Sequence, residues 1–236
     1  IILKTFPDSN NITLTKKRYV YRYRYTKVFE VYSHGGYNLD ETTEKDIINY
    51  INNNVNMFDV IVIADFGHGL ITENIKNSIL KTEKFLAVNA QTNSGNLGYN
   101  YITKYKNFDF TTLTEEELRL PLQDLKTNNE ELVRKLSDIT NCKKICLTIG
   151  KKGILYYENK NEIYQSPALV TKVVDTVGAG DAVFSIISML AYKNVQPELI
   201  PFVGNCIGAL AVQVMGNKKP INQADLYNFI TNILKK

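Results

Sequence analysis

Three continuous apolar runs, separated by helical patterns, constrain the fold of this chain more than any other feature. The runs are DVIVIAD (59–65), FLAVN (85–89) and KICLTI (144–149), and their β-branched and large apolar residues are typical of strands buried on both faces. Between the second and third runs, residues 129–139 have the period of an amphipathic helix. Buried strands that alternate with helices predict an α/β fold, with a mostly parallel sheet covered by helices on both faces.

Local signals place the other elements of this domain. Thr43 is expected to cap a helix with an apolar face, and residues 159–161 are expected to turn a hairpin. Two apolar helices are predicted to follow, one from Asp181 and one over about residues 197–215. A last helix is expected after Asn222.

The N-terminal part of the chain follows a different pattern. In residues 19–25, tyrosines alternate with Val20, Arg22 and Arg24, which is the period of a strand. Together with residues 28–32, they predict a two-stranded ribbon with tyrosines on one face and cations on the other. The ribbon is either a sheet with a solvated basic face or a lid whose Arg22 and Arg24 bind an anionic substrate.

Length and composition fit one domain with a small addition. The chain has 236 residues, of which 44% are hydrophobic, and this is enough for one full-sized core. We assign residues 12–36 to a β lid and residues 37–236 to the α/β domain. The net charge of +4 is too small to indicate a nucleic-acid partner. The longest apolar run, around residues 182–191, is too short to cross a membrane.

The cysteines favour ordinary thiols in a reducing compartment. Cys142, Cys146 and Cys206 are odd in number and show no disulfide framework. The chain has only two histidines, so a zinc site is disfavoured. We therefore expect a cytoplasmic protein with free thiols.

The stretch DTVGAGDAVFS (175–185) combines small residues with an acid at the start of a predicted helix. Gly178, Ala179 and Gly180 let the backbone approach a ligand closely, and the first N–H groups of a helix have no internal partners. Such a turn is an anion hole suited to phosphate oxygens. We interpret Asp181 as the base that orients a hydroxyl and takes its proton during phosphoryl transfer. Taken alone, a glycine turn before a helix is usually only structural.

The run from Val174 to Phe184 resembles the C-terminal pattern of the ribokinase-like (PfkB) sugar kinases. Thr148 to Gly153 is similar to the T-x-G-x-x-G turn that lies along the nucleotide in that family, and the helix with Asn205 resembles the segment lining its adenine pocket. The resemblance covers nearly the whole chain and implies a ribokinase-like fold, with ATP as cofactor. It implies that the nucleotide contacts Thr148, Gly150, Lys151, Gly153, Asp175, Thr176, Asn205 and Gly208.

Two further stretches resemble a subgroup of these kinases. VIADFGHGLIT (62–72) is similar to a run of the heptose-phosphate kinases, the kinase half of bifunctional heptose kinase–nucleotidyltransferases. Residues 88–105 resemble sugar kinases fused to a cytidylyltransferase-like domain. The resemblance implies a fused or separate nucleotidyltransferase partner. It also implies that Asp65 and His68 contact the substrate, although His68 stands where the heptose kinases carry lysine.

Amide side chains are concentrated in the loop after the second buried run. Asn89, Gln91, Asn93 and Asn96 lie in a segment that contains glycines and follows a predicted strand. Asn89, Gln91 and Asn93 are predicted to bind sugar hydroxyls or phosphate. The alternative is that these amides only shape the turn.

Glu117 is the candidate ligand for Mg²⁺. The related kinases carry an N-x-x-E motif that acts on Mg²⁺ and phosphate, and the matching window here is Thr114 to Glu117, with Thr in place of Asn. Thr-x-x-Glu before Leu118 is also a capping box, which explains both residues by helix stability alone. Both interpretations stay open.

The N-terminal side departs most from the family. These kinases begin with a strand that carries a sugar-binding Asp and with a Gly-Gly element, and neither precedes the ribbon. Gly35-Gly36 follows the ribbon instead. We expect either a segment outside this sequence or a protein that has lost ordinary sugar binding.

Three hypotheses follow for the function. The leading one is an ATP- and Mg²⁺-dependent kinase that acts on a hydroxyl of a sugar or sugar phosphate, such as a heptose phosphate. The rival is a degenerate, non-catalytic domain that binds nucleotide or sugar and supports a nucleotidyltransferase. A vitamin kinase of the same fold is the third. The tyrosine face of the lid is expected to form a homodimer.

Overall fold

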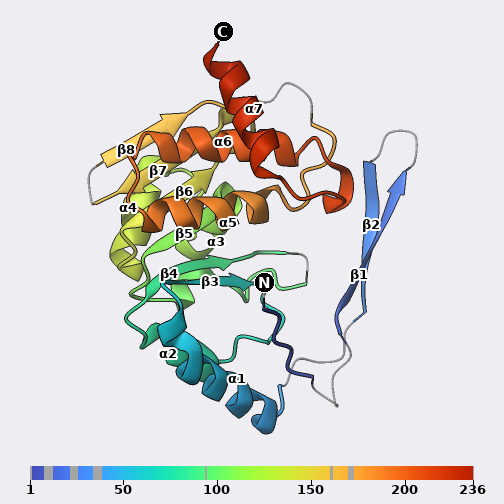
Figure 1. Cartoon of the computed structure of the whole chain (residues 1–236), viewed down its shortest axis with the longest axis vertical. Helices are drawn as coiled ribbons and strands as arrows, with labels where there is room; N and C mark the ends of the chain where they lie inside the picture. Colours follow the sequence, from blue (N-terminus) through green and yellow to red (C-terminus); the bar gives the residue numbers. More distant parts are fainter. Residues whose placement is uncertain are drawn as a thin grey trace.

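The structure is a computed structural model that describes residues 2–7, 13–21, 26–33, 39–93, 95–159, 162–169 and 173–235. A six-stranded sheet in the order β3-β4-β5-β6-β7-β8 forms its centre (Figure 1). The strands β3 to β6 pair in parallel, whereas β7 and β8 each pair antiparallel with the strand before them. The bounds are β3 Val60–Asp65, β4 Phe85–Ala90, β5 Phe110–Thr114, β6 Lys144–Thr148, β7 Ile154–Glu158 and β8 Glu162–Ser166. The predicted α/β fold with a mostly parallel sheet is confirmed.

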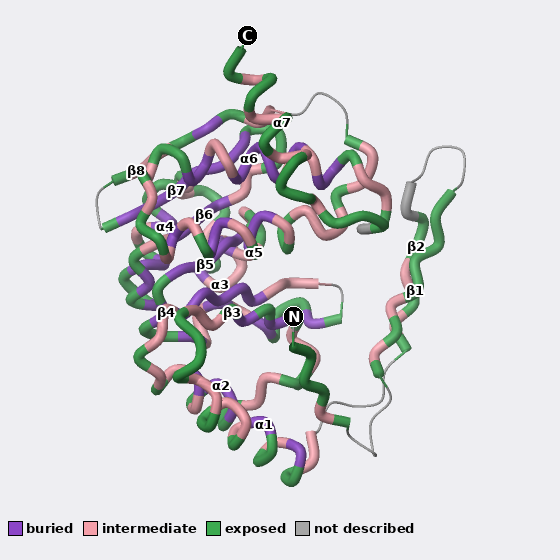
Figure 2. Tube along the Cα trace, in the orientation of Figure 1, coloured by how far each residue is buried: buried purple, intermediate pink, exposed green. Residues whose placement is uncertain are grey.

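Helices cover both faces of this sheet because successive strand residues point to opposite sides. Leu155 and Tyr157 of β7 pack in one core with helices α1 to α4, whereas Ile154 and Tyr156 pack in a second core with α5 and α6. Figure 2 shows the buried residues concentrated in the central strands between these layers. The helices are α1 Glu41–Asn54, α2 Glu73–Leu80, α3 Glu115–Leu122, α4 Asn129–Thr140, α5 Ala179–Tyr192, α6 Leu199–Ala211 and α7 Gln223–Leu234.

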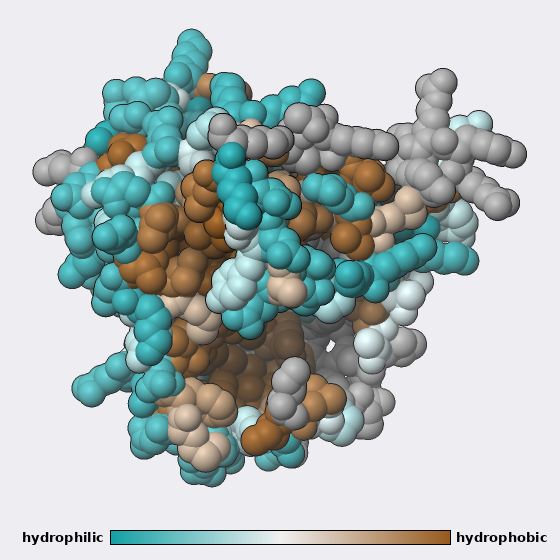
Figure 3. Space-filling view, turned by 45° about the horizontal axis from the view of Figure 1, so that its top comes forward, coloured by the Kyte–Doolittle hydropathy of each residue, from teal (hydrophilic) through white to brown (hydrophobic). Residues whose placement is uncertain are grey.

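Strand β3 differs from the prediction of a strand buried on both faces. It is an edge strand of the described sheet, and although Ile63 is buried, Val62 is 42% exposed. β-branched residues suit any half-buried pleated surface, so the apolar run does not distinguish an edge strand from a central one. Apolar side chains also gather in the hollow of the face that Figure 3 shows.

Helix starts were predicted to within a few residues, with two corrections. The N-cap of α1 is Asp40 and not Thr43, because the Asp40 carboxylate accepts the Thr43 N–H at 2.9 Å and the Thr43 hydroxyl at 2.7 Å. Helix α5 begins at Ala179, before Asp181, because the glycine that precedes it serves as the N-cap. The predicted start of the last helix is confirmed, since Asn222 caps α7.

The predicted ribbon is present as a separate two-stranded sheet. β1 (Thr15–Tyr21) and β2 (Thr26–Ser33) pair antiparallel. The ribbon stands beside the carboxyl end of β3, at the edge of the body (Figure 1). Arg22 and Arg24, which were predicted to bind substrate, lie outside the described residues.

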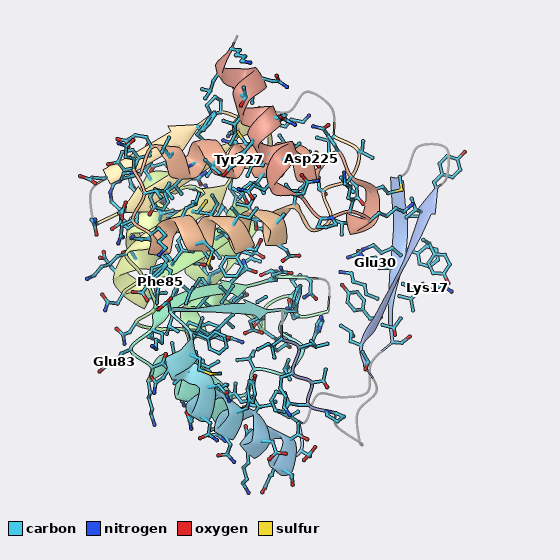
Figure 4. The ribbon with its side chains drawn as sticks, in the orientation of Figure 1. Lys17, Glu30, Glu83, Phe85, Asp225 and Tyr227 are labelled. Carbon is cyan, nitrogen blue, oxygen red and sulfur yellow. The ribbon has the colours of Figure 1, made fainter. Side chains whose placement is uncertain are left out.

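The two faces of the ribbon differ in chemistry. On the outer face, Tyr19 stacks on Phe29 with ring centroids 4.3 Å apart, and the Lys17 ammonium lies 5.1 Å from the Tyr19 ring. On the other face, Lys16 and Glu30 form an ion pair at 2.9 Å. Figure 4 shows Glu30 pointing toward the body of the molecule and Lys17 pointing away. The predicted separation of aromatic and charged faces holds for Tyr19, Lys16 and Glu30, with two exceptions. Lys17 lies on the aromatic face, and Tyr32 lies on the charged face, where its ring is 4.8 Å from the Lys16 ammonium.

The cysteines behave as core residues. Cys142, Cys146 and Cys206 are buried and unpaired, as expected. Burial raises the pKa of the Cys206 thiol to about 11, which disfavours the reactive thiolate. Separately, none of the described helices combines the length and the apolar character needed to cross a membrane.

Candidate active site

Two cavities open at the carboxyl ends of the parallel strands, where open α/β sheets commonly bind ligands. The smaller has a volume of about 190 Å³ and is lined by Asn89, Gln91, Thr112, Leu113, Thr114, Glu117, Thr148, Gly178, Gly180 and Asp181. The larger has a volume of about 670 Å³ and lies between the ribbon and the loop after β3; its lining includes Lys16, Arg18, Glu30, Asp65, His68, Asn93 and Val177. Both cavities are lined by Gln91, Gly178 and Asp181, so these residues form the wall between them.

The start of α5 presents the N–H groups of Gly180 and Asp181 to this wall, whereas the Ala179 N–H, which was predicted to join the anion hole, donates to the Thr176 carbonyl at 3.3 Å. Gly178 is the N-cap in the left-handed conformation (φ 76°), and no described side chain caps the helix. The first intrahelical bond runs from the Ala182 N–H to the Gly178 carbonyl at 3.0 Å, so the N–H groups of Gly180 and Asp181 precede it. A Cβ atom on Gly180 would meet no described atom within 4 Å. Packing therefore does not require this glycine, and the predicted anion hole has the necessary open space.

Asp175 fastens this turn to the rest of the domain. One of its carboxylate oxygens accepts the Val177 N–H at 3.0 Å, and the other accepts the Gly216 N–H at 2.9 Å. The Asp175 N–H donates in turn to the Val212 carbonyl at 3.1 Å, after the end of α6. These contacts give Asp175 a positioning role. Its predicted contact with nucleotide, and that of the exposed Thr176, remain predictions.

Asp181 lies at the meeting point of the two cavities. Its Oδ1 accepts a hydrogen bond from the Nε2 of Gln91, at the end of β4. Burial raises the pKa of the Asp181 carboxyl, and the hydrogen bond from Gln91 opposes this rise. Asp181 is exposed as a residue, so the rise reflects desolvation of its carboxyl within the cleft. A carboxylate with a raised pKa is a stronger base than one with the ordinary value, as proton abstraction from a hydroxyl requires.

The amides after β4 serve mainly to build the loop. Asn93 and Asn96 both donate to the Phe66 carbonyl, at 2.9 and 2.8 Å, and so join this loop to the one after β3. The Asn93 Oδ1 accepts the Gly95 N–H at 2.9 Å. Turn chemistry thus accounts for Asn93, and its predicted contact with substrate stays untested.

Asn89 is different, because one of its polar atoms has no partner. Its Nδ2 donates to the Thr112 carbonyl at 2.8 Å. Its Oδ1 is buried and accepts no hydrogen bond from the described residues. Since Asn89 is only 7% exposed and lines the smaller cavity, this oxygen is an available acceptor for a ligand or a water.

Asp65 is held in a buried network that the sequence did not reveal. Its carboxylate accepts the Gly67 N–H at 2.9 Å and the Tyr105 hydroxyl at 2.6 Å, and it pairs with Lys104 at 2.6 Å. Asp65 is only 3% exposed, and burial together with its charge raises the pKa of Tyr105. Lys104 and Tyr105 lie about forty residues from Asp65, and no local pattern marks them as partners. The network shapes the loop that carries His68, which lines the larger cavity.

Internal contacts of the fold account for part of the turn after β6. The Thr148 hydroxyl donates to the Leu113 carbonyl at 3.1 Å, and Thr148 lines the smaller cavity. A Cβ atom on Gly153 would lie 2.0 Å from the Ser166 carbonyl oxygen, so the fold itself requires that glycine. Gly150 has a positive φ of 53°, and Lys151 is exposed.

The two residues predicted on the adenine side lie on α6. The Asn205 Nδ2 donates to the Ser166 carbonyl at 2.7 Å, which ties α6 to the end of β8. A Cβ atom on Gly208 would make an ordinary contact with Val183 at 3.8 Å. Neither residue lines the two cavities among the described residues. Their role in nucleotide binding remains a prediction.

Glu117 forms the capping box that its spacing predicted. Its Oε2 accepts the Thr114 N–H at 2.9 Å, and the Thr114 Oγ1 accepts the Glu117 N–H at 3.2 Å. Its Oε1 accepts the Thr92 N–H at 3.0 Å, which joins α3 to the loop after β4. Burial raises the pKa of Glu117, and these N–H donors oppose the rise. Glu117 also lines the smaller cavity, so its predicted Mg²⁺ role remains open beside the confirmed capping role.

The chain resembles known carbohydrate kinases in sequence. Residues 13–224 match the sequence profile of the pfkB family carbohydrate kinases. The bifunctional protein HldE of Desulfatibacillum aliphaticivorans is 22% identical over 192 residues, which are 80% of this chain and 38% of that protein. The chain therefore spans well under half the length of this relative.

Solved structures share the fold at low sequence identity. Ribokinase of Thermotoga maritima aligns with a TM-score of 0.74 and 18% identity, over 94% of this chain and 71% of the other. Ribokinase of Arabidopsis thaliana, complexed with ribose and ATP, aligns with a TM-score of 0.65 and 14% identity, over 94% and 70% of the two chains. With a ribokinase-like fold and a family match over most of its length, this chain belongs to the pfkB family of carbohydrate kinases.

Proposed function

We propose that this chain transfers the γ-phosphoryl group of ATP to a hydroxyl of a sugar or sugar phosphate. The observation that carries the proposal is the position of Asp181 and the α5 turn in the wall shared by two cavities. Phosphoryl transfer needs a phosphate donor and a hydroxyl acceptor on either side of a base and an anion hole. We place the terminal phosphates of the nucleotide in the smaller cavity and the acceptor in the larger one.

The chain's own groups supply the chemistry. The unpaired N–H groups at the start of α5 bind the negative charge that spreads over the phosphate oxygens as the group moves. Asp181 accepts the proton of the attacking hydroxyl. The raised pKa of Asp181 suits this role, because the protonated Asp181 carboxyl that results is then less unfavourable.

The oxygen-rich lining of the smaller cavity fits Mg²⁺, which prefers oxygen ligands and keeps several of its waters. Glu117 would hold the ion, and the unpartnered Oδ1 of Asn89 can accept a hydrogen bond from a water near it. When bound, the ion supplies positive charge to the nucleotide phosphates.

The larger cavity supports an acceptor that already carries a phosphate. Lys16, Arg18 and His68 line it, and cations recognise phosphate. Glu30 offsets part of that charge, because it lies 2.9 Å from Lys16 and 3.6 Å from Arg18. The match to HldE supports a heptose phosphate as the first acceptor to test.

The wider organisation follows from the same resemblance. We propose that residues 12–36 act as a lid on a nucleotide-binding domain of residues 37–236, in a cytoplasmic protein. Exposed Tyr19 and Phe29 supply an apolar outer face for a homodimer. The relative is named bifunctional and extends well beyond the matched part, which supports a fused or separate nucleotidyltransferase as partner.

A non-catalytic domain is the second candidate. Both carboxylate oxygens of Glu117 already accept backbone N–H groups, and Thr114 replaces the Asn of the family motif. A site that had lost its metal ligand would bind nucleotide without turnover.

Two measurements on the purified chain test these functions. ADP formation from ATP and Mg²⁺ is followed with a panel of sugars, sugar phosphates including heptose phosphates, and vitamin alcohols, while calorimetry measures ATP binding. Acceptor-dependent ADP formation that Asp181→Asn abolishes supports the kinase. ATP binding without turnover of any acceptor, in a folded chain, supports the non-catalytic domain.

A further inference from the structure

Gln91 contacts Asp181 in the wall between the two cavities. Its Nε2 donates to the Asp181 Oδ1, although the two residues are 90 positions apart and lie at the end of β4 and the start of α5. Among the described residues, the other oxygen of Asp181, Oδ2, accepts no hydrogen bond. The carboxylate is therefore held on one side and open on the other.

The backbone of Gln91 is fixed from several directions. Its N–H donates to the Asp65 carbonyl at 2.9 Å. Its carbonyl accepts from the Nδ2 groups of Asn96 at 2.8 Å and Asn100 at 3.1 Å. These asparagines also donate to the Phe66 and Asp65 carbonyls. The buried amides of this loop thus fix the backbone of Gln91, from which its side chain extends toward Asp181.

We infer that Gln91 is a positioning residue for Asp181: its amide holds Oδ1 and leaves Oδ2 to receive the proton of the acceptor hydroxyl. The inference rests on the proposed kinase function and assigns Gln91 a role other than substrate binding. In the step that it serves, the acceptor O–H proton passes to Oδ2 and the acceptor oxygen bonds to the γ-phosphorus. The bond from that phosphorus to the bridging oxygen breaks, and ADP leaves with the electron pair.

The same contact favours the ionised form of Asp181, because an amide N–H forms a stronger hydrogen bond with a carboxylate oxygen than with the carbonyl oxygen of a protonated carboxyl group. Other ionisable groups line the two cavities; they are Glu117 of α3, Lys16, Arg18 and Glu30 of the ribbon, Asp65 of β3 and His68 in the loop after it. Loss of the Gln91 donor should raise the pKa of Asp181. The fraction able to act as base at a given pH then falls, and the acid side of the rate profile moves to higher pH.

Two substitutions at position 91 change the donor in opposite directions. Gln91→Met keeps the length of the side chain and removes the donor, whereas Gln91→Lys replaces a neutral donor by a charged one. Carboxyl ¹³C NMR on the full chain gives the pKa of Asp181 directly, with the resonance identified by its loss in Asp181→Asn. We expect the pKa to rise by about one unit in Gln91→Met and to fall by about one unit in Gln91→Lys.

A matched control separates this effect from a general effect of losing a glutamine. Gln165 also donates to a carboxylate, that of Glu130 at 3.1 Å, in an exposed pair outside the two cavities. Gln165→Met should leave the pKa of Asp181 and the turnover unchanged. An equal pKa for Asp181 in the wild type, Gln91→Met and Gln91→Lys, all folded by circular dichroism, would overturn the inference.

Kinetics then connect the contact to the reaction. With the best acceptor from the panel, Gln91→Met should lower kcat about tenfold with little change in KM for ATP. At low pH, Gln91→Lys should have a higher kcat than Gln91→Met. Unchanged kcat in Gln91→Met would also overturn the inference, while the kinase itself would stand. Failure of the kinase proposal is separate, since it would appear as no turnover in the wild type, and the NMR titration needs no substrate.

Discussion

Two glycine turns of this protein look alike in sequence but differ in what surrounds them. Both the turn after β6, residues 150–153, and the turn before α5, residues 178–180, were predicted to lie against the nucleotide. A Cβ atom on Gly153 would lie 2.0 Å from the Ser166 carbonyl oxygen, whereas one on Gly180 would meet no described atom within 4 Å. The fold requires the first glycine, and nothing in the described packing requires the second.

The difference shows how a glycine of the fold can be told from a glycine of the site. A glycine in a helix costs about 1 kcal/mol relative to alanine, and Gly180 lies in the first turn of α5. The described packing gives no reason for this residue, which agrees with the proposed close approach of a ligand. The contrast therefore separates substitutions that change folding from those that change activity.

We call the turn before α5 the open turn and the turn after β6 the closed turn. The strongest test of their difference is to remove Asp181, the acid that follows the open turn. Asp181→Asn should lower turnover about a thousandfold, because the general base is lost. ATP affinity and unfolding free energy should change little, and calorimetry and urea denaturation measure both. Asp225→Asn is a matched control, since Asp225 is also an acid in the first turn of a helix. Turnover within tenfold of wild type in Asp181→Asn would remove Asp181 from the chemistry.

Substitution in the closed turn should act on folding instead. Gly153→Ala should lower the unfolding free energy by about 3 kcal/mol, because its φ of 96° is strained for alanine and the added carbon collides with backbone. Gly150→Ala is the control, since Gly150 has a φ of 53° but no described atom within 4 Å of an added carbon. It should cost about 1 kcal/mol. Equal losses in urea denaturation would mean that the collision is relieved without strain.

The open turn should show the reverse behaviour. Gly180→Ala should leave the unfolding free energy unchanged or raise it by less than about 1 kcal/mol, while ATP affinity falls about tenfold, equivalent to about 1.4 kcal/mol. Calorimetry and urea denaturation on the same preparation measure both quantities. Ser185→Ala, an exposed position on the same helix, should change neither. A loss of stability as large as that of Gly153→Ala would erase the contrast between the turns.

The smallest effect tests whether the closed turn also touches the nucleotide. Lys151 is exposed, and Lys151→Met should weaken ATP binding less than tenfold because an exposed cation is screened by water and salt. The weakening should decrease as the salt concentration rises. ATP affinity that is identical to wild type at low salt would leave the turn after β6 with a purely structural role.

Local rules were enough for most of the fold. The predicted buried runs became β3, β4 and β6, and the helix over residues 129–139 became α4. Residues 19–21 of the alternating run entered the ribbon as part of β1, and residues 22–25 lie outside the described residues. The errors share a cause, because a sequence pattern indicates which secondary structure a segment favours and not which other segments pack beside it. Val62 belongs to a strand-forming run yet is 42% exposed, because β3 is an edge strand of the described sheet.

The candidate site divides in the same way. The sequence by itself determined the turn with Gly178 and Gly180, the acid that follows it and the capping box at Glu117, because each depends on residues within one helical turn. Only the tertiary structure decided that Gln91 meets Asp181 and that Asp65 pairs with Lys104. These partners are separated by dozens of residues, and the order of strands in the sheet, which no local periodicity contains, brings them together.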